Sequence, residues 1–376
     1  MDCTGAAHAH YSRSIVEVFD VAIVGGGPAG ACCAAFCSQA GLRTLVVERE
    51  RFPREKVCGD CINPAAWPVL ERLQVAERLR ALPHGRLQRV EFVAIGGRTV
   101  SVELPEGAEI AVKRSLFDYL LLTRAAECGA HVCERSTVSV VTPPAAQSEN
   151  WRIRAGTGDY AARILVAADG RNSTIARLLG LSPKLQHERV GLQAHIPLPE
   201  VFGDRVVLQF RPEGYSGQAP VGNGELNLCL VGKARDIASL RTWAEKEFSI
   251  PKEQTWRTIT PLRRAALAPA RNRLFLVGDA ARVVEPFTGE GIFYALRSGE
   301  LAAAAIKSLF ENGFADGRDE AAARGYAISH ERVYRGRLWV NRIARAAVLS
   351  PRLASALLDA GVLHPRILRL LTTKIV

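Results

Sequence analysis

The sequence lacks the features that mark several large classes of protein. No apolar run approaches the roughly 20 residues of a membrane-spanning helix, and residues 1–14 contain no apolar core of an export signal. None of the eight histidines has a second ligand at metal-binding spacing, and there is no internal repeat. We therefore expect a cytoplasmic globular protein of 376 residues without a metal site, in which residues 1–15 form a mobile tail.

The number of cysteines and the distribution of charge exclude further classes of protein. Nine cysteines, an odd number without an export signal, indicate reduced thiols rather than a disulfide framework. The net charge is +11, and residues 332–376 supply +8 of it, because they hold nine Arg or Lys against the single Asp359. Outside that segment there is no basic stripe with interleaved aromatic residues, so we expect no binding to nucleic acid.

Residues 331–376 are predicted to form a basic helical segment with two faces. An apolar face and a basic face lie opposite each other on a helical wheel, formed by Trp339, Val340, Ile343 and Ala347 and by Arg335, Arg342 and Arg345. Such a helix can make peripheral contact with an anionic membrane. It can equally pack on the rest of the protein with a solvated Arg face, and the sequence leaves both interpretations open.

A βαβ unit is predicted near the start of the chain. The apolar run 18–24 ends in a Gly-rich turn, residues 31–40 have a helical composition, and a second apolar run over 44–47 ends at Glu48. The turn supplies G-x-G-x-x-G through Gly25, Gly27 and Gly30, with an acidic residue 18 positions later. Glycines at this spacing allow a tight turn and close approach of a pyrophosphate, and the acid can accept ribose hydroxyls. We predict a bound adenine dinucleotide.

Two further strand ends carry an Asp. The apolar run 164–168 is followed by Asp169-Gly170, and the run 274–277 by Gly278-Asp279. After Asp279 the chain crosses a Pro/Thr/Gly loop and resumes as a small-residue helix from about Gly291. An Asp beyond a buried strand can accept hydrogen bonds from a polyol, and a Gly-flanked helix start offers N–H groups to an anion.

The predicted fold class is α/β, with a Rossmann-like parallel sheet, an inserted and mostly antiparallel substrate domain, and C-terminal helices. The predicted boundaries are 16–86, 108–186 and 262–330 for the first domain, and 87–107 and 187–261 for the second. Within these ranges we predict a helix over 63–82, a hairpin over 90–102, a helix over 115–128 and strands at 206–210, 226–231 and 256–259.

Taken together, the three strand-end sites resemble the FAD-binding fold of p-hydroxybenzoate-hydroxylase-type monooxygenases, flavin-dependent halogenases and geranylgeranyl reductases. The resemblance covers nearly the whole chain and implies FAD as the cofactor. It implies binding roles for residues on the pyrophosphate, ribose, ribityl and flavin sides of FAD: Gly25, Gly27, Gly30, Glu48, Arg49, Arg114, Asp169, Gly170, Asp279, Gly289, Gly291 and Ile292. A helix N-terminus beside the flavin would favour the negative charge of its reduced form.

Lys56 to Asp60, which read KVCGD, and Pro286 to Ile292, which read PFTGEGI, are most similar to the geranylgeranyl reductase branch. Those reductases place a Tyr-x-Trp-x-Phe-Pro motif where this chain reads Tyr-Ser-Gly-Gln-Ala-Pro from Tyr215 to Pro220. Candidate catalytic residues are Cys58 beside the flavin, Glu290, and Tyr215 facing the substrate, with Cys58 or Glu290 as the proton donor of a reductase. Glu290 can alternatively order its loop and Tyr215 can be a core residue.

Two reactions on an apolar or aromatic small molecule are compatible with these residues. A reductase delivers hydride to a carbon–carbon double bond, and a monooxygenase transfers oxygen to a phenol or alkene in a dry pocket. The KVCGD and PFTGEGI segments favour the reductase. No second strand-coupled G-x-G-x-x-G is present, so NAD(P)H either visits the flavin directly or reduces it through a separate flavin reductase.

Overall fold

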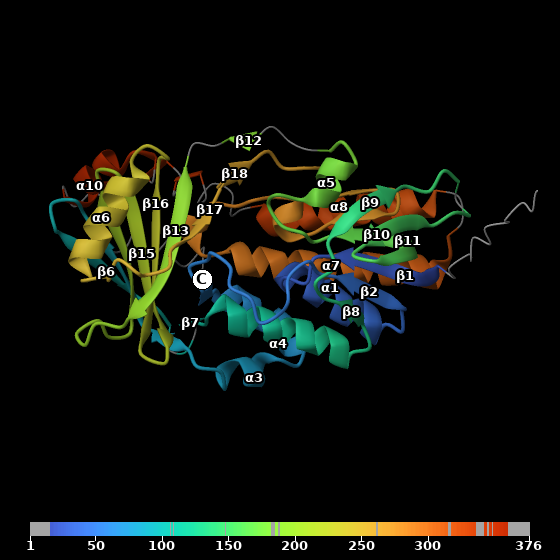
Figure 1. The fold of residues 1–376 in the computed structure, drawn as a ribbon, viewed down its shortest axis with the longest axis horizontal. Helices are drawn as coiled ribbons and strands as arrows, with labels where there is room; N and C mark the ends of the chain where they lie inside the picture. Colours follow the sequence, from blue (N-terminus) through green and yellow to red (C-terminus); the bar gives the residue numbers. More distant parts are fainter. Residues whose placement is uncertain are drawn as a thin grey trace, which may run out of the picture.

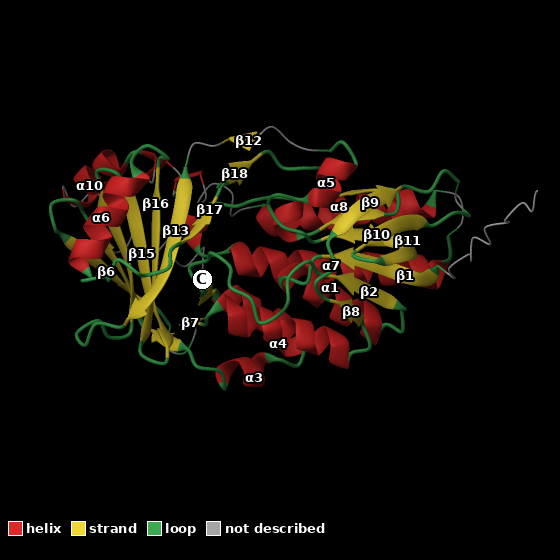
Figure 2. Ribbon diagram, viewed as in Figure 1, coloured by secondary structure: helices red, strands yellow, loops and turns green. Residues whose placement is uncertain are grey.

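The computed structural model describes residues 16–335, except 106, 108, 147, 182–184, 187, 188, 261, 315 and 316, and then residues 342, 343, 346, 347 and 349–359. The predicted tail over 1–15 lies outside the described residues, as do Trp339, Val340 and Arg345 of the predicted two-faced helix. Two bodies stand side by side, each built around its own large sheet (Figures 1 and 2). The predicted α/β class is confirmed.

The first sheet has eight strands and a parallel core. Its order is β19 (Ala270–Arg271), β20 (Leu274–Leu276), β11 (Gly158–Ala167), β1 (Glu17–Val24), β2 (Thr44–Val47) and β8 (His131–Cys133). An antiparallel extension from β11 adds β10 (Trp151–Ala155) and β9 (Val138–Thr142). The parallel strands are continuous apolar runs, as expected for strands covered on both faces. Their carboxyl ends meet at one edge, where the predicted strand-end residues lie.

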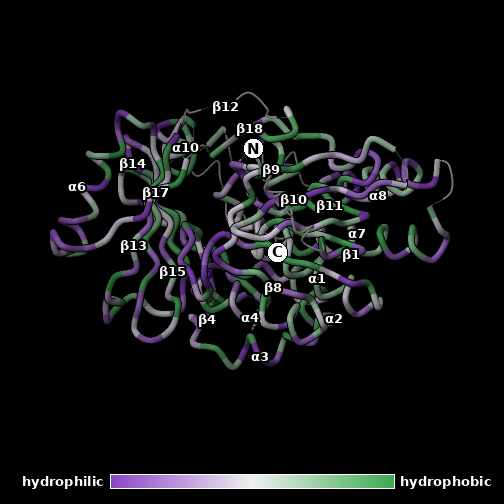
Figure 3. The backbone as a smooth tube through the Cα atoms, turned by 45° about the vertical axis from the view of Figure 1, so that its right-hand side comes forward, coloured by the Kyte–Doolittle hydropathy of each residue, from purple (hydrophilic) through white to green (hydrophobic). Residues whose placement is uncertain are grey.

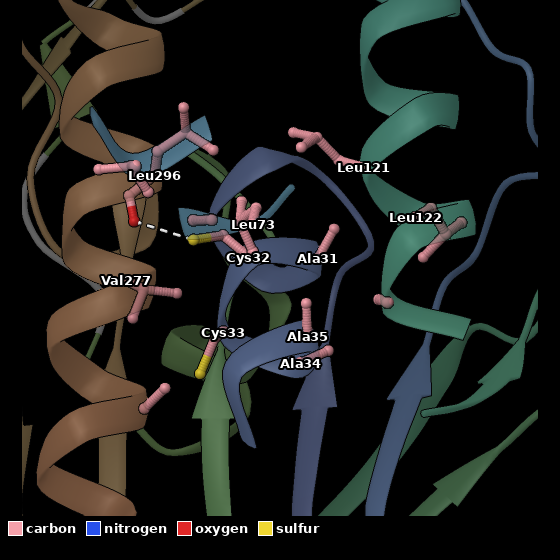
Figure 4. Close-up of a cluster of buried hydrophobic side chains, with 14 of the residues drawn as sticks. Ala31, Cys32, Cys33, Ala34, Ala35, Leu73, Leu121, Leu122, Val277 and Leu296 are labelled. Atoms are coloured by element: carbon pink, nitrogen blue, oxygen red, sulfur yellow. Dashed lines mark hydrogen bonds between the residues drawn. The ribbon is translucent and has the colours of Figure 1, made fainter. Parts of the chain in front are cut away.

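Helix α1 (Pro28–Gln39) is central to the packing of this body, between α7 (Gly291–Asn312) and α4 (Arg114–Glu127) (Figure 4). Small side chains permit the close approach: a Cβ on Gly299 of α7 would collide with the Ala29 carbonyl oxygen. The Cys32 thiol donates a hydrogen bond to the Leu296 carbonyl at 3.2 Å, so Cys32 contributes to the packing of α1 on α7. Figure 3 shows hydrophobic segments where β1, β11 and α1 pack and hydrophilic segments along outer loops.

The second sheet has seven strands and is mostly antiparallel, with one parallel pair, β14 and β5. Its order is β17 (Arg257–Ile259), β13 (Val190–Pro197), β16 (Glu225–Gly232), β15 (Gly214–Gly222), β14 (Arg205–Arg211), β5 (Arg89–Val93) and β6 (Thr99–Glu103). Helix α6 (Ile237–Glu247) packs on one face through Leu240 and Ala244. Helix α10 (Pro351–Asp359) packs on the other through Ala354 and Leu358.

Short elements complete the described structure. Two small sheets are formed by β3 (Cys61–Ile62), β7 (Glu109–Ala111) and β4 (Gly85–Leu87), and by β12 (Leu185–Gln186) and β18 (Arg263–Arg264). The remaining helices are η1 (Pro64–Ala66), α2 (Trp67–Arg72), α3 (Ala76–Arg80), α5 (Thr174–Leu178), η2 (Gly278–Ala280), η3 (Pro286–Thr288) and α8 (Arg318–Tyr334). The single helix predicted over 63–82 is wrong: Gln74, at φ 59°, breaks it between α2 and α3.

Candidate active site

The Gly-rich turn between β1 and α1 has the shape that the dinucleotide motif requires. Gly25 has φ 106°, and a Cβ there would lie 2.5 Å from the Ala168 carbonyl oxygen. A Cβ on Gly30 would collide with the Gly25 carbonyl oxygen, so Gly30 serves close packing between helix and strand. A Cβ on Gly27 would meet only the Arg54 guanidinium, at 3.6 Å, so this backbone is open to a pyrophosphate.

Glu48 lies at the end of β2 with its carboxylate held in place. Its Oε2 accepts from the Gly26 N–H at 2.6 Å and its Oε1 from the Glu50 N–H at 2.9 Å. A carboxylate has about four acceptor positions, so two remain for ribose hydroxyls. Arg49 points into solvent, with 68% of its side chain exposed and an ion pair to Glu50 at 3.6 Å. A role for Arg49 in cofactor binding stays a prediction.

A buried cluster of charge lies beside the turn. Arg114, at the start of α4, makes two hydrogen bonds to Asp118, at 2.6 and 2.7 Å, and Arg54 contacts the same carboxylate at 2.9 Å. Burial opposes ionisation of Asp118, yet the Arg114 guanidinium holds the pKa of Asp118 below its ordinary value. Burial lowers the pKa of Lys56 to about 8, and Arg114 acts in the same direction. The cluster carries more positive than negative charge, which suits a phosphate group.

The two strand-end aspartates have different surroundings. Asp279 lines the cavity described below, and its Oδ2 lies 3.2 Å from Arg171. Its backbone carbonyl accepts a hydrogen bond from Arg264. Asp169 instead accepts the Ile175 N–H at 2.9 Å at the start of α5, while the neighbouring Gly170, at φ 80°, lines the cavity. The Asp169 side chain therefore orders a turn, and its neighbour presents open backbone.

The loop before α7 brings bare backbone to the same space. A Cβ on Gly289 or Gly291 would meet nothing within 4 Å, and Gly289 has φ 69°. Both glycines and Ile292 line the cavity. Glu290 has 0% exposed surface, accepts a hydrogen bond from the Tyr294 hydroxyl at 3.2 Å, and is absent from the cavity lining. This placement suits the interpretation that Glu290 orders its loop.

Cys58 is held against the second sheet through its backbone. Its carbonyl oxygen accepts from Gln193 at 2.8 Å, Asn227 at 2.8 Å and the Cys229 thiol at 3.2 Å. Two residues further on, Asp60 Oδ2 lies 2.8 Å from His195 Nε2. The segment containing Cys58 is thereby fixed between the two bodies. Its four polar partners, which come from β13 and β16, were not predicted.

The strand pattern could have revealed those partners. In β13, Gln193 and His195 alternate with the apolar Leu192, Ala194 and Ile196, which pack under α6. Strand β16 has the same alternation, because Asn227 and Cys229 fall between leucines. Period-two alternation predicts one apolar and one polar face. The alternation by itself does not show that the polar face of these strands points inward, toward the Cys58 segment.

A cavity of about 350 Å³ is lined by residues from the Gly-rich turn, the Cys58 segment, the strand ends and the loop before α7. At one end lie Gly27, Gly170, Asp279 and Gly291, and at the other lies an apolar wall from β5, β14, β15 and β16. That wall includes Phe92, Leu208, Phe210, Tyr215 and Val231. Tyr215 contacts Phe287 edge to face at 5.1 Å, and burial raises the pKa of Tyr215 well above its ordinary value, so it stays a neutral phenol.

The C-terminal segment also reaches this space. Ile343 and Ala347, which belong to the predicted apolar face, line the cavity together with Leu358 of α10. Peripheral membrane contact through the basic face stays a prediction. Among the described residues, no helix has the length and apolar character to cross a bilayer, and no three His, Cys, Asp or Glu side chains gather in a way that could hold a metal ion.

Comparison with known proteins decides the family. The model of the FAD binding domain family matches residues 18–229, more than half of the chain. The chain belongs to the FAD binding domain family. This flavoprotein is an FAD-dependent oxidoreductase, and the residues around its Gly-rich turn fit the cofactor. Gly27, Glu48, Asp279 and the α7 start could hold it, and Arg54, which was not predicted, adds a cation next to Gly27.

Relatives of the flavoprotein include several reductases. Menaquinone reductase of Mycolicibacterium smegmatis is 29% identical over 348 residues, covering 82% of each chain. Digeranylgeranylglycerophospholipid reductase of Methanosphaerula palustris is 28% identical over 320 residues, covering 78% of each chain. Both alignments cover more than three quarters of this chain, so the similarity extends well beyond the Gly-rich turn.

Solved structures share the fold at lower identity. The flavin-dependent brominase Bmp2 superposes with a TM-score of 0.74 at 21% identity, covering 94% of this chain and 93% of that one. PqsL of Pseudomonas aeruginosa in complex with 2-aminobenzoylacetate gives 0.76 at 19% identity, covering 91% of this chain and all of that one. At these identities the likeness establishes the fold alone.

Proposed function

We propose that this flavoprotein reduces a carbon–carbon double bond in an apolar small molecule. The observation that carries the proposal is the continuous cavity, which has bare backbone and Asp279 at its cofactor end and a wall of aromatic and aliphatic side chains at the other. An apolar substrate that fills the second part would exclude water from the reacting atoms. The names of the two reductase relatives support reduction over oxygen transfer.

FAD would supply a hydride when bound and reduced, and the residues of the chain would position both partners. Gly289 and Gly291 bring open backbone to the flavin side, where the start of α7 offers its N-terminal end. Cys58 is fixed at the junction of the two bodies by three hydrogen bonds to its carbonyl, so its side chain would border both cofactor and substrate. Tyr215 would contact the substrate as part of the apolar wall.

We further infer that NAD(P)H is the source of electrons and that it visits the flavin directly. The sequence contains one strand-coupled Gly-rich motif, which the FAD would occupy. Gly170, with open backbone beside the cavity, is where a visiting nicotinamide would approach. Steady reduction of the FAD-loaded protein by NADPH or NADH alone would support this route, whereas reduction only after a flavin reductase is added would support the separate donor.

A single-turnover experiment tests the reaction. The protein is loaded with FAD, reduced with dithionite without oxygen, and mixed with geranylgeraniol as a polyprenyl probe. We expect the flavin to be reoxidised as the product gains two hydrogens. If the flavin stays reduced until air is admitted, and the product then gains an oxygen atom, the protein is a monooxygenase and the proposal is wrong.

A further inference from the structure

Asp60 is a buried carboxylate at the boundary between the two bodies. It follows Cys58 in the KVCGD segment, lines the cavity, and has 0% of its side chain exposed to bulk solvent. Its Oδ2 lies 2.8 Å from His195 Nε2, and its backbone carbonyl accepts the Val112 N–H at 2.9 Å. These contacts fix the orientation of the carboxyl group from β13 on one side and from the β7 end on the other.

The second carboxyl oxygen has no hydrogen bond within the described part of the chain. Asp60 Oδ1 is buried without a partner, which destabilises the folded protein. A side chain with a purely structural role would be expected to have both oxygens hydrogen-bonded. Asp60 also adopts φ 61°, which is rare outside glycine and enriched at functional positions. An oriented carboxyl group with one unpaired oxygen, on a residue that lines the cavity, is suited to exchange a proton with a ligand there.

The titratable groups around Asp60 come from β13, α4, β3 and β16. Burial raises the pKa of Asp60, while His195 of β13 and Arg114 of α4 lower it, Arg114 through its charge and its backbone N–H. The thiols of Cys61 and Cys229 face the same carboxyl group, and burial raises the pKa of both, so they stay neutral. The net effect is an acid that retains its proton to a higher pH than an exposed aspartic acid.

We propose that Asp60 is the catalytic proton donor of the cavity and that His195 positions it and returns its proton. The inference rests on the proposed function. FAD, when bound and reduced, would supply a hydride to one carbon of the double bond. The Asp60 carboxyl group would give its proton to the other carbon and become a carboxylate. Solvent then returns a proton through His195, so the substrate has gained two electrons and two protons.

Other acids around the cavity fit this role less well. The Glu290 carboxylate is engaged by the Tyr294 hydroxyl and lies behind the cavity wall. Glu109 of β7 lines the cavity, and burial raises its pKa to about 7, which makes it the direct rival. No histidine or other proton carrier is hydrogen-bonded to Glu109 among the described residues, whereas Asp60 has His195 at 2.8 Å. Of these three acids, Asp60 is the one with a histidine contact, among the described residues, through which its proton could be replaced.

The test uses Asp60→Asn and Glu109→Gln in the full-length, FAD-loaded protein. Asn tolerates a positive φ as well as Asp does, so the backbone of the first variant should be kept. In the anaerobic single turnover with geranylgeraniol, we expect Asp60→Asn to slow flavin reoxidation by roughly 100-fold or more, with unchanged FAD affinity. Glu109→Gln should slow flavin reoxidation by a clearly smaller factor than Asp60→Asn does. The reverse pattern, or a normal rate in Asp60→Asn, would overturn the proposal.

The pH profile separates proton transfer from a structural role. The acid form of Asp60 is the active one, so the wild-type rate should fall as the pH rises through the Asp60 pKa. His195→Ala removes a contact that lowers this pKa, so the fall should move to higher pH, and His195→Gln, which can still donate to Oδ2, should move it back toward the wild type. A profile that is unchanged in His195→Ala would contradict the positioning role.

A second readout keeps this inference distinct from the proposed function. Infrared difference spectra taken across pH report protonated carboxyl groups without any substrate. We expect a protonated-carboxyl band that persists above the range of ordinary aspartates in the wild type. Glu109→Gln should lose the part that Glu109 contributes, and Asp60→Asn should lose a separate part. If the wild type leaves geranylgeraniol unreduced but this band is present, the proposed function fails and the buried acid stands. If the band is the same in Asp60→Asn, the Asp60 inference fails by itself.

Discussion

Single glycines at the nucleotide-binding turn have separable roles, which substitution by alanine can distinguish. Gly30 is limited by packing, because its Cβ would collide with the Gly25 carbonyl oxygen and lie 2.9 Å from the Ala168 Cβ. Gly30→Ala should therefore push α1 away from the sheet and lower the free energy of unfolding by about 1–3 kcal/mol. Urea unfolding followed by circular dichroism measures the change.

A matched substitution on α8 provides the control. Gly325 lies inside that helix, and a Cβ there would meet nothing within 4 Å. Gly325→Ala should leave the protein as stable as before or raise the free energy of unfolding by up to about 1 kcal/mol, because alanine favours the helix. Equal stability of the two variants would show that the Gly30 contact relaxes without cost.

His330 on α8 predicts a specific pH dependence of stability. It contacts the rings of Tyr326 and Tyr334, and burial, followed by the Arg282 charge, lowers its pKa from 6.5 to about 4. A histidine that stays neutral when folded stabilises the protein fully above pH 6.5, and this contribution is lost as the pH falls toward 4. The difference corresponds to about 3 kcal/mol.

A pair of Phe variants isolates that contribution. His330→Phe keeps an aromatic ring and removes the titrating group, so the loss of stability between pH 6.5 and 4 should be about 3 kcal/mol smaller than in the wild type. His131→Phe, at an exposed position of β8, should keep the wild-type slope. Free energies of unfolding at several pH values in that interval measure both, and parallel curves for wild type and His330→Phe would refute the assignment.

At the scale of elements, the sequence predicted what is local. Strand β1, the Gly-rich turn, α1 and β2 follow one another within 31 residues, and each carries its own pattern. Strands β13 and β15 were missed. Strand β15 contains Gly214, Gly217, Pro220 and Gly222, residues typical of turns, and is held in the sheet by β14 and β16 on its two sides. Tertiary pairing outweighs local preference there.

The loop that enters α7 is tied to the second sheet by a buried ion pair. Arg189, just before β13, makes hydrogen bonds of 2.6 and 3.1 Å to Glu285, and both side chains are 5% exposed. Removal of one partner leaves a charge in a dry environment. Arg189→Met should therefore lower the free energy of unfolding by about 3 kcal/mol or more, measured by urea unfolding.

The second half of a double-mutant cycle tests the cause. Arg189→Met combined with Glu285→Leu removes both charges, and the double variant should recover most of the stability that Arg189→Met loses. The weakened tie should also lower FAD affinity in Arg189→Met, because Glu285 immediately precedes the loop that carries Gly289. Additive losses in the double variant would show that packing, and not the charge pair, accounts for the effect.

For the whole molecule, the cavity is lined by residues of both bodies, and this arrangement was beyond prediction from the sequence. The cofactor end could be predicted because its residues stand at strand ends within recognisable motifs. The substrate end depends on which residues of β14, β15 and β16 lie opposite one another, as when Gly217 pairs with Leu208 and Cys229. That register is set by contacts between distant segments, which no local pattern records.

The size of the cavity depends on Gly217 of β15, which is part of its lining. A Cβ there would meet only Leu208, at 3.6 Å, so a larger side chain would extend into the cavity instead of displacing the sheet. Gly217→Trp should raise KM for a bulky apolar substrate by roughly tenfold or more while FAD affinity stays unchanged. Val201→Trp, at a position that is 87% exposed, should change neither KM nor FAD affinity.

Two measurements check this prediction. Flavin fluorescence gives the FAD affinity, which should stay constant, and initial rates with polyprenyl alcohols of increasing length give KM. Because an indole at residue 217 takes space only from the far end of the cavity, the shortest alcohols should be affected least. Equal effects at every length would place the substrate elsewhere.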